Sequence, residues 1–355
     1  MQTIFKGKKI TSMLGVLPEQ EILFDDEVDN YDFPPKQTMR LKKVMGFEKH
    51  RISKDTTTAS DLAVYGLNYM LDNGWIKRDE IGALIVVSLC PDHFVPHISN
   101  IIHGKTGLDS SVLCMDIPQG CCGFLLGLSQ AFMLLEHLDK KIVVINTDVL
   151  SHKVSKRDRN DYPLIGDGAA ITVVENSEDD DEIYYEMHMD GSRGSTLIIP
   201  AGGFRMPSNE KTAVMENTGD GNYRSLDNMH MDGSGVFNFV QTEVPPMLEH
   251  VLKETHSALD DFDYFLFHQP NKFMLQKLAE KSGIPFEKLP MNLVEDYGNT
   301  SGASIPMVTI HNLKDQLLKN EYKCLLSAFG SGLAWGSMVI NLGKLSHCEM
   351  IVSDL

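Results

Sequence analysis

The 355-residue sequence predicts an α/β protein made of two halves. Short runs of aliphatic and β-branched residues alternate with segments whose apolar residues recur at helical spacing, which is typical of α/β architectures. The chain is longer than one hydrophobic core usually organises, so two lobes or a duplicated fold are expected. A run of five acids at 178–182, expected to be a solvated loop, separates two such series. We therefore place the halves at residues 1–177 and 178–355.

The first half contains signals for two helices and four buried strands. Thr56–Asp61 starts a helix whose apolar residues continue to Leu71 and which Gly74 ends. Residues 124–138 are apolar on most sides at helical spacing, which predicts a buried helix. Uninterrupted apolar runs predict strands at Ala83–Val87, Val112–Met115, Ile142–Ile145 and Ala170–Val174.

The second half repeats the alternation after an irregular stretch. Residues 201–229 contain four glycines and a proline, which predict a long insertion without regular structure. After it, helices are predicted at Asn271–Lys281 and Ala303–Leu317. Strands are predicted at Tyr264–Phe267, Lys323–Ala328 and Ser337–Leu342.

The hexapeptide Met-His-Met-Asp-Gly-Ser occurs at 187–192 and again at 229–234. Two copies do not establish a repeat, and we interpret each as a strand or loop that ends in an Asp-Gly turn. His188 and His230 lack partner ligands at metal-binding spacing, so no metal site is expected.

Composition and charge narrow the functional classes. The chain is 42% apolar and 23% charged, which is ordinary for a soluble globular protein. A net charge of −17 argues against binding to nucleic acid or anionic membranes. No apolar run reaches the roughly 18 residues that span a bilayer, and residues 1–17 do not resemble a secretory signal. Six cysteines without a CxxC pair indicate reduced thiols, so a cytoplasmic location is expected.

A nucleophile is suggested by the segment Gly120-Cys121-Cys122-Gly123-Phe124. It joins a predicted strand to an apolar helix, so a cysteine stands at a helix N-terminus. There the helix dipole and free backbone N–H groups stabilise a thiolate and can also hold an oxyanion. The alternative is a buried cysteine that packs as a small hydrophobic residue.

Two further polar residues follow predicted strands or open helices. His268 comes directly after the strand Tyr264–Phe267, at the carboxyl end where α/β proteins place their sites. Asn299 lies in a loop that opens the next helix. A cysteine with a neutral histidine and an asparagine provides a nucleophile and two hydrogen-bond donors, which suits thioester chemistry. Taken singly, His268 could be a core histidine and Asn299 a helix cap.

Five motifs in this order resemble the β-ketoacyl-acyl carrier protein synthase III branch of the thiolase superfamily across nearly the whole chain. They are Gly120-Cys121-Cys122-Gly123-Phe124, Ile165-Gly166-Asp167-Gly168-Ala169, Phe267-His268-Gln269-Pro270-Asn271, Gly298-Asn299-Thr300-Ser301 and Ala328-Phe329-Gly330-Ser331-Gly332-Leu333-Ala334-Trp335-Gly336. The resemblance implies a duplicated five-layered α-β-α-β-α fold and a homodimer. It also implies that Cys121 is the nucleophile, because the family's cysteine lies two residues before the Gly-Phe pair, and that Cys122 only packs.

The resemblance further implies a decarboxylating Claisen condensation. Cys121 would take an acyl group from a thioester while the backbone N–H groups of Cys121 and Ser331 hold the oxyanion. Loss of CO₂ from a malonyl thioester would leave an enolate that accepts hydrogen bonds from His268 and Asn299. No metal or redox cofactor is expected.

Departures from the family pattern concern the substrates. Ser331 replaces a loop glycine, and Arg40 and Val44 stand where relatives often clamp the CoA adenine, so that clamp is absent. Arg159 matches an arginine that binds the adenine or phosphates of CoA. Phe94 and Val95 match the place of a family residue that closes the acyl pocket, often that of the dimer mate; ordinary loop packing is the alternative.

Partners and alternatives follow from the same residues. An acidic acyl carrier protein needs a basic patch. Lys272, Lys277 and Lys281 lie on the helix where the family docks its carrier; a plain solvated lysine face is the alternative.

A second hypothesis for the function retains Cys121 but transfers the acyl group from CoA or carrier protein to an amine, alcohol or sugar. A third, a non-catalytic heterodimer partner, fits poorly with an intact Cys-His-Asn set.

Overall fold

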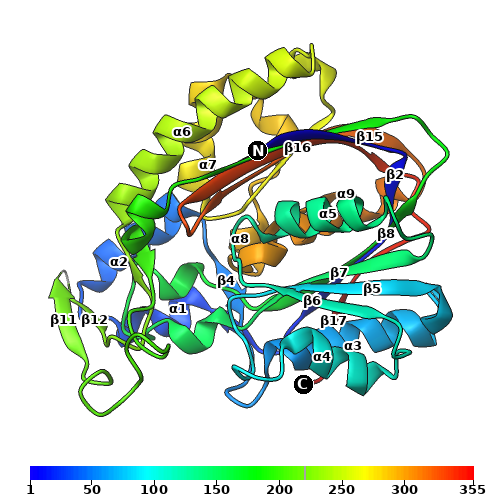
Figure 1. Cartoon of the computed structure of the whole chain (residues 1–355). Coiled ribbons are helices and arrows are strands. Elements are labelled where there is room, and N and C mark those ends of the chain that lie inside the picture. Colours follow the sequence, from blue (N-terminus) through cyan, green and yellow to red (C-terminus); the bar gives the residue numbers. More distant parts are fainter. Residues whose placement is uncertain (220) are drawn as a thin grey trace.

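Two mixed β-sheets run through the computed structural model, which describes residues 1–219 and 221–355 (Figure 1). The first sheet has the order β17 (His347–Val352), β2 (Lys8–Leu17), β8 (Gly168–Asn176), β7 (Lys141–Asp148), β5 (Ile81–Val87) and β6 (Leu113–Ile117). The second has the order β1 (Gln2–Lys6), β9 (Glu182–Met189), β16 (Ala334–Gly343), β15 (Glu321–Gly330) and β14 (Tyr264–Phe267).

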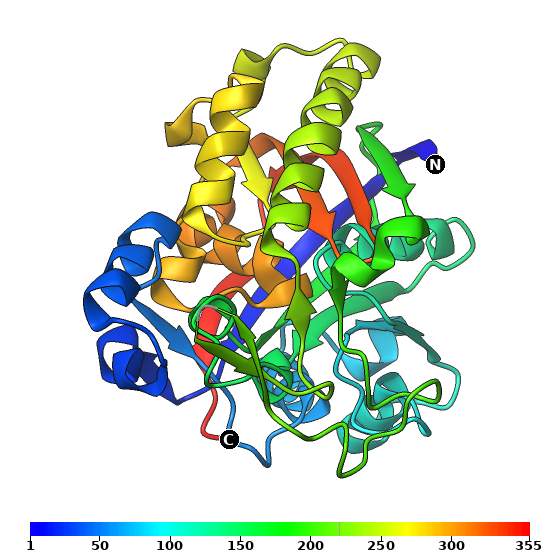
Figure 2. The same ribbon diagram turned by 90° about the vertical axis from the view of Figure 1, so that its left-hand side faces the viewer.

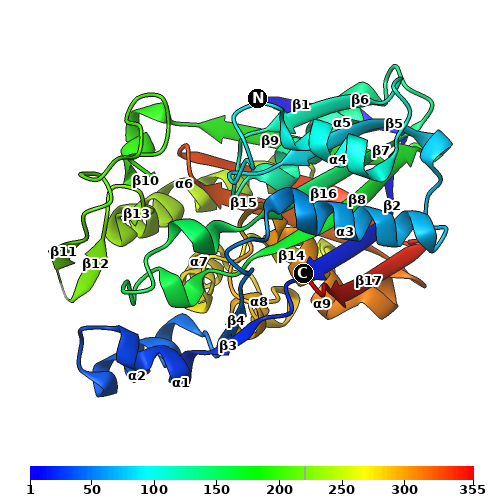
Figure 3. The ribbon, with the colours of Figure 1, turned by 90° about the horizontal axis from the view of Figure 1, so that it is seen from below.

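Helices fill the three remaining layers. In Figure 1, α5 (Gly123–Leu134) and α9 (Ser304–Leu317) lie between the sheets, and α6 (Gly233–Glu254) and α7 (Lys272–Ser282) cover the second sheet. The view from below shows α3 (Ala59–Asp72) and α4 (Ile98–Thr106) on the outer face of the first sheet (Figure 3). These layers give the predicted five-layered order, with one apolar core on each side of each sheet.

Burial on both faces explains why the central elements could be read from apolar runs. All seven residues of β5 are buried, and β5 pairs in parallel with β6 and β7. Strand β14 has the predicted bounds, and α9 begins one residue after its predicted start. Helix α5 ends at Leu134 rather than 138, because Glu136 and His137 donate to the carbonyls of Met133 and Leu134 in a tighter turn.

The first strand of the chain belongs to the second sheet, and the last strand belongs to the first sheet. Residues 177–181 join β8 of the first sheet to β9 of the second. Strand β1 nevertheless pairs with β9, whereas β17 pairs with β2. The first and last strands therefore tie the two sheets to one another, and this pairing has no local signal in the sequence.

The 22-residue helix α6 was not predicted, and the expected Asp-Gly turn at 232–233 is wrong. Asp232 is instead the N-cap of α6, where its side chain accepts a hydrogen bond from Gly235 N–H (2.9 Å). In the other copy of the hexapeptide, Asp190 caps a short 3₁₀ helix over Gly191–Thr196. Pro245 and Pro246 interrupt the sequence pattern of α6, but its buried face holds it in place.

Smaller elements cover one end of the sheets. These are α1 (Phe24–Glu27), α2 (Pro35–Met45), α8 (Leu293–Asp296), the pair β3 (Glu21–Leu23) and β4 (Lys49–Arg51), the pair β10 (Leu197–Ile198) and β13 (His230–Met231), and the pair β11 (Glu216–Gly219) and β12 (Asn222–Arg224). Figure 2 faces this end and shows the segment that contains β10 to β13, in green, in front of the sheets. In its described residues the predicted insertion 201–229 is thus largely loop, with one short hairpin from which the Tyr223 hydroxyl donates to Asp32 (3.2 Å).

Gly166 permits a close backbone contact on which the fold depends. A methyl group at this position would overlap the carbonyl oxygen of Tyr297 and lie 3.0 Å from Gly298 Cα. We expect Gly166→Ala to lower the free energy of unfolding by about 1–3 kcal/mol, the usual cost of overpacking, as measured by urea unfolding. Gly191→Ala is the control, since its added methyl group meets no atom within 4 Å. Equal stabilities of the two variants would contradict the importance of this contact.

Candidate active site

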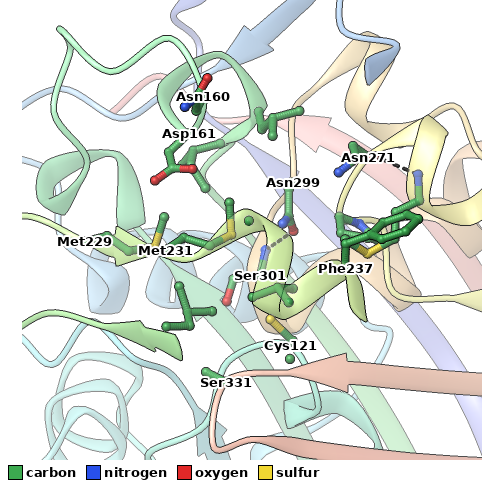
Figure 4. A pocket seen from close by; sticks show the side chains of 18 of the residues that line it. Cys121, Asn160, Asp161, Met229, Met231, Phe237, Asn271, Asn299, Ser301 and Ser331 are labelled. Atoms are coloured by element: carbon green, nitrogen blue, oxygen red, sulfur yellow. Dashed lines mark hydrogen bonds between the residues drawn. The ribbon is translucent and has the colours of Figure 1, made fainter. Parts of the chain in front are cut away.

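A cavity of about 680 Å³ brings the three predicted residues together (Figure 4). Cys121, His268 and Asn299 all line it, although they come from segments far apart in the sequence. Most of the remaining wall is apolar and includes Leu89, Leu150, Leu164, Ile165, Leu197, Ile199, Met229, Met231, Phe237, Met274 and Phe329. A long apolar chain with few polar groups fits such a lining.

Cys121 stands in the turn between β6 and α5. Gly123 N–H closes this turn on Gly120 C=O at 2.6 Å. Cys122 is fully buried and its thiol points elsewhere, toward Ala334 C=O at 3.3 Å. Figure 4 shows the Cys121 thiol directed into the cavity, so its accessibility differs from that of its neighbour. The end of β15 lies so close that a side chain at Gly330 would overlap Cys121 Sγ.

Two opposing effects act on the Cys121 thiol. Burial raises its pKa, whereas hydrogen bonds from the backbone N–H groups of Ser331 and Cys121 lower it. Burial is the larger effect, so the resting group is a thiol rather than a thiolate. The same two N–H groups are the pair predicted for the oxyanion, and both lie against the reacting sulfur.

His268 is buried at the end of β14 and stays neutral. Burial lowers its pKa to about 3, against which a backbone hydrogen bond with Ser301 acts in the opposite direction. Its Nδ1 lies 2.7 Å from Ser304 Oγ, which in turn accepts from Gln269 N–H at 3.4 Å. The Ser304 proton is therefore available to Nδ1, and this arrangement places the imidazole proton on Nε2.

Asn299 is fixed by its backbone and by its own side-chain oxygen. Its N–H donates to Leu164 C=O at 2.6 Å, and Gly166 N–H donates to its C=O at 3.1 Å. Its Oδ1 accepts from Ser301 N–H at 3.0 Å. Because the amide oxygen is engaged in this way, the amide Nδ2 remains as the donor available to the cavity.

The residues that support this site could not be assigned from the sequence. Asp148, at the end of β7, accepts from Leu89 N–H (2.7 Å) and Ser88 Oγ (3.1 Å). Burial raises its pKa to about 6. Ser301 and Ser304 stand in or beside a quoted motif, but a serine in a loop carries no signal for such contacts.

The other predicted residues lie outside this cavity wall. Phe94 and Val95 are exposed, and the Phe94 ring packs on Phe204 with centroids 5.0 Å apart. The Arg159 guanidinium lies 3.6 Å from the centre of the Phe33 ring. Arg40 and Val44 are exposed on α2.

The three lysines of α7 are engaged with their own chain. Lys272 pairs with Glu295 (3.3 Å), Lys277 pairs with Glu280 (2.7 Å), and Lys281 donates to Gln241 C=O (2.6 Å). A partner would have to displace these contacts, which lowers the gain expected from each lysine.

Within residues 1–219 and 221–355, no group of three or more histidine, cysteine, aspartate or glutamate side chains is arranged to hold a metal ion. None of the helices in these same ranges is both long and apolar enough to cross a membrane.

Comparison with known proteins identifies the family. Residues 115–191 match the family model "3-Oxoacyl-[acyl-carrier-protein (ACP)] synthase III", and residues 252–342 match the model of its C-terminal part. A putative 3-oxoacyl-[acyl-carrier-protein] synthase 3 of Campylobacter jejuni is 32% identical over 356 residues, which covers 99% of each chain. The chain belongs to the 3-oxoacyl-[acyl-carrier-protein] synthase III family.

Other members of the family align with this chain along nearly its full length. The β-ketoacyl-[acyl-carrier-protein] synthase III of Streptococcus uberis is 31% identical over 94% of this chain and 99% of the relative. A crystal structure of 3-oxoacyl-(acyl-carrier protein) synthase from Burkholderia xenovorans superposes with a TM-score of 0.91 at 30% identity, over 99% of both chains. The predicted family and its thiolase fold are confirmed. The first synthase III match contains Cys121, and the second contains His268 and Asn299.

The neutral state of His268 predicts a specific acid sensitivity. An unfolded chain protonates this histidine below about pH 6.5, but the folded chain does so only near pH 3. The folded state therefore loses about 1.4 kcal/mol per pH unit as the pH falls between these values. We expect His268→Gln to lose about 2 kcal/mol less than the wild type between pH 7 and pH 5, measured by urea unfolding. His93→Gln, at an exposed site, is the control, and identical pH dependence in all three proteins would contradict a neutral buried His268.

Proposed function

We propose that the protein condenses an acyl thioester with malonyl-acyl carrier protein through an acyl group carried on Cys121. The observation that supports this most directly is the convergence of one thiol and two neutral donors, His268 and Asn299, on one apolar cavity. Relatives named as synthase III match along nearly the whole chain, which supports the same activity. The enzyme is thus an acyltransferase that forms a carbon–carbon bond.

The first half-reaction transfers the acyl group. Cys121 Sγ attacks the thioester carbonyl, the carbonyl oxygen becomes an oxyanion held by the N–H groups of Cys121 and Ser331, and the substrate thiol leaves with the proton of Cys121. The N-terminus of α5 stabilises negative charge on the sulfur as it attacks. Because the buried Cys121 rests as a neutral thiol, its sulfur carries no charge before the substrate binds.

The second half-reaction forms the new bond. A malonyl thioester loses CO₂, and the released electron pair forms an enolate whose oxygen accepts from His268 Nε2–H and Asn299 Nδ2–H. The α-carbon then attacks the acyl carbonyl, and Cys121 leaves as a thiolate that takes up one proton from solvent. A histidine with a pKa near 3 suits this task, because it donates a hydrogen bond without titrating at neutral pH. These steps require neither a metal ion nor a redox cofactor.

The same proposal includes the partners and the assembly. Substrates are CoA and carrier-protein thioesters, and the location is cytoplasmic. A homodimer is supported by β6, which forms one edge of the first sheet with Leu113 exposed. Phe94 and Val95 are exposed on the loop beside it, where a second copy could bring them to an acyl pocket. Analytical ultracentrifugation tests this, and a mass equal to the 39.7 kDa chain would contradict it.

Acyl transfer should occur on Cys121 alone. Incubation with acyl-CoA should add one acyl mass to the wild type and to Cys122→Ser, and none to Cys121→Ser, as read by intact-mass spectrometry with peptide mapping. The reason is that, of the two adjacent thiols, that of Cys121 faces the cavity and that of Cys122 points to Ala334 C=O. An acyl group mapped to Cys122 would contradict this assignment.

Asn299→Ala should separate the half-reactions. We expect acyl-enzyme formation to change less than threefold and malonyl decarboxylation to fall about 100-fold, the usual loss for one oxyanion donor. The assays are intact mass and CO₂ release. If decarboxylation survives, transfer to an amine, alcohol or sugar becomes the better account of the site.

Carrier docking on α7 should be weak and sensitive to salt. Because Lys272, Lys277 and Lys281 already contact their own chain, we expect their combined replacement by glutamate to raise KM for malonyl-acyl carrier protein roughly three- to thirtyfold. The effect should shrink in high salt, and acylation from a small CoA donor should stay unchanged. Unchanged kinetics with the carrier substrate would place docking on another surface.

A further inference from the structure

In the described part of the chain, no group donates a hydrogen bond to the buried carboxyl group of Asp161, which lies in the cavity away from Cys121 (Figure 4). Asp161 precedes a short 3₁₀ helix at Tyr162–Leu164 and is only 1% exposed, yet it lines the cavity. Neither of its carboxylate oxygens accepts a hydrogen bond from any residue in the described part of the chain. Figure 4 shows this side chain directed toward the cavity interior.

The neighbours of Asp161 do not satisfy it. Arg224, from the hairpin of the insertion, makes its short ion pair with Asp158 and reaches Asp161 only at 3.4 Å. Asp158 also accepts from Asn160 N–H at 3.0 Å, so this second carboxylate is well bonded. Burial and the charge of Asp158 raise the pKa of Asp161, which shows that its ionised form is poorly stabilised. A buried polar group in this state is costly unless a ligand supplies the missing donor.

The surrounding charge indicates which part of a substrate passes Asp161. Lys153, Lys156, Arg157 and Arg159 lie within the seven positions that end at Arg159, in a chain of net charge −17. The first three are exposed, and the segment then enters the cavity at Asn160 and Asp161. A phosphate would bind at such a basic segment, while the reacting thioester must lie at Cys121.

In both CoA and carrier proteins, the acyl group is carried on an arm that has a phosphate at one end and the thioester sulfur at the other. This arm begins with a phosphate, continues with a hydroxyl and two amides, and ends at the sulfur. With its phosphate at the basic segment and its sulfur at Cys121, the hydroxyl and the first amide N–H fall between them. These are neutral donors, which is what Asp161 lacks.

Resting on the proposed function, we propose that Asp161 is a specificity-determining residue for this arm: its carboxyl group accepts a hydrogen bond from the arm's hydroxyl or the adjoining amide N–H. Arg224 is a positioning residue that holds the acidic pair beside the path of the arm. The contact recognises the arm and not the acyl chain, so it serves CoA and carrier-protein substrates alike.

Substrate truncation tests this contact. Self-acylation rates are measured with acyl-CoA, with acyl-pantetheine, which lacks the phosphate, and with acyl-N-acetylcysteamine, which also lacks the hydroxyl and the adjoining amide. We expect Asp161→Ala to lower kcat/KM about ten- to hundredfold for the first two donors, through KM, and less than twofold for the third. Asp161→Asn, which keeps the shape and one acceptor oxygen, should lose less than fivefold with the first two donors.

Two results would overturn the proposal. An equal loss with all three donors would mean that Asp161 only supports the structure, and an unchanged rate with acyl-CoA would mean that the arm does not touch it. If the alanine variant fails to fold, the ratio between long and short donors is read from Asp161→Asn. Failure of the proposed function is distinct, because the wild type itself would then take no acyl group from any donor.

Discussion

The active site depends on the close approach of two backbone segments, Leu164–Gly166 and Tyr297–Asn299. Each segment donates one hydrogen bond to the other, from Asn299 N–H to Leu164 C=O and from Gly166 N–H to Asn299 C=O. The contact is possible because Gly166 has no side chain to strike the Tyr297 carbonyl, and because Gly298 adopts a positive φ of 86°. It places the Asn299 amide over the cavity, opposite the turn that carries Cys121, and so joins the two halves where the chemistry occurs.

Exclusion of water then sets the protonation of the reacting groups. Burial disfavours the charged form of both Cys121 and His268, so one rests as a thiol and the other as a neutral imidazole. Charge develops only during reaction, on the attacking sulfur, on the oxyanion and on the enolate oxygen, and fixed donors stand at the site of each. In a cavity with apolar walls such donors act more strongly than they would in water.

The insertion contributes to the site as well as covering it. Met229, its last residue, forms part of the apolar wall together with Met231 of the following strand β13, and Arg224 reaches across from the hairpin to Asp158 and Asp161. Unbranched methionine side chains adapt to irregular shapes, which suits a passage for a flexible arm. A segment without regular structure can therefore still define what the cavity accepts.

The sequence by itself determined the elements that are buried on both faces. Strands such as β5 and β14 are continuous apolar runs, and α7 is capped by Asn271, whose side chain accepts from Met274 N–H. Their signals are local, because burial on both faces and helix capping each leave a mark within a few residues. The ordered motifs also indicated the family and the candidates Cys121, His268 and Asn299.

Only the tertiary structure decided which groups meet. It directs Cys121 and not Cys122 into the cavity, sets Ser304 against His268, and brings Arg224 to two aspartates that precede it by more than sixty positions. Helix α6 was missed because two prolines obscure its pattern, and it is held by packing rather than by propensity. Such contacts join residues distant in the chain, and their energies depend on burial and neighbouring charges, which exist only once the chain has folded.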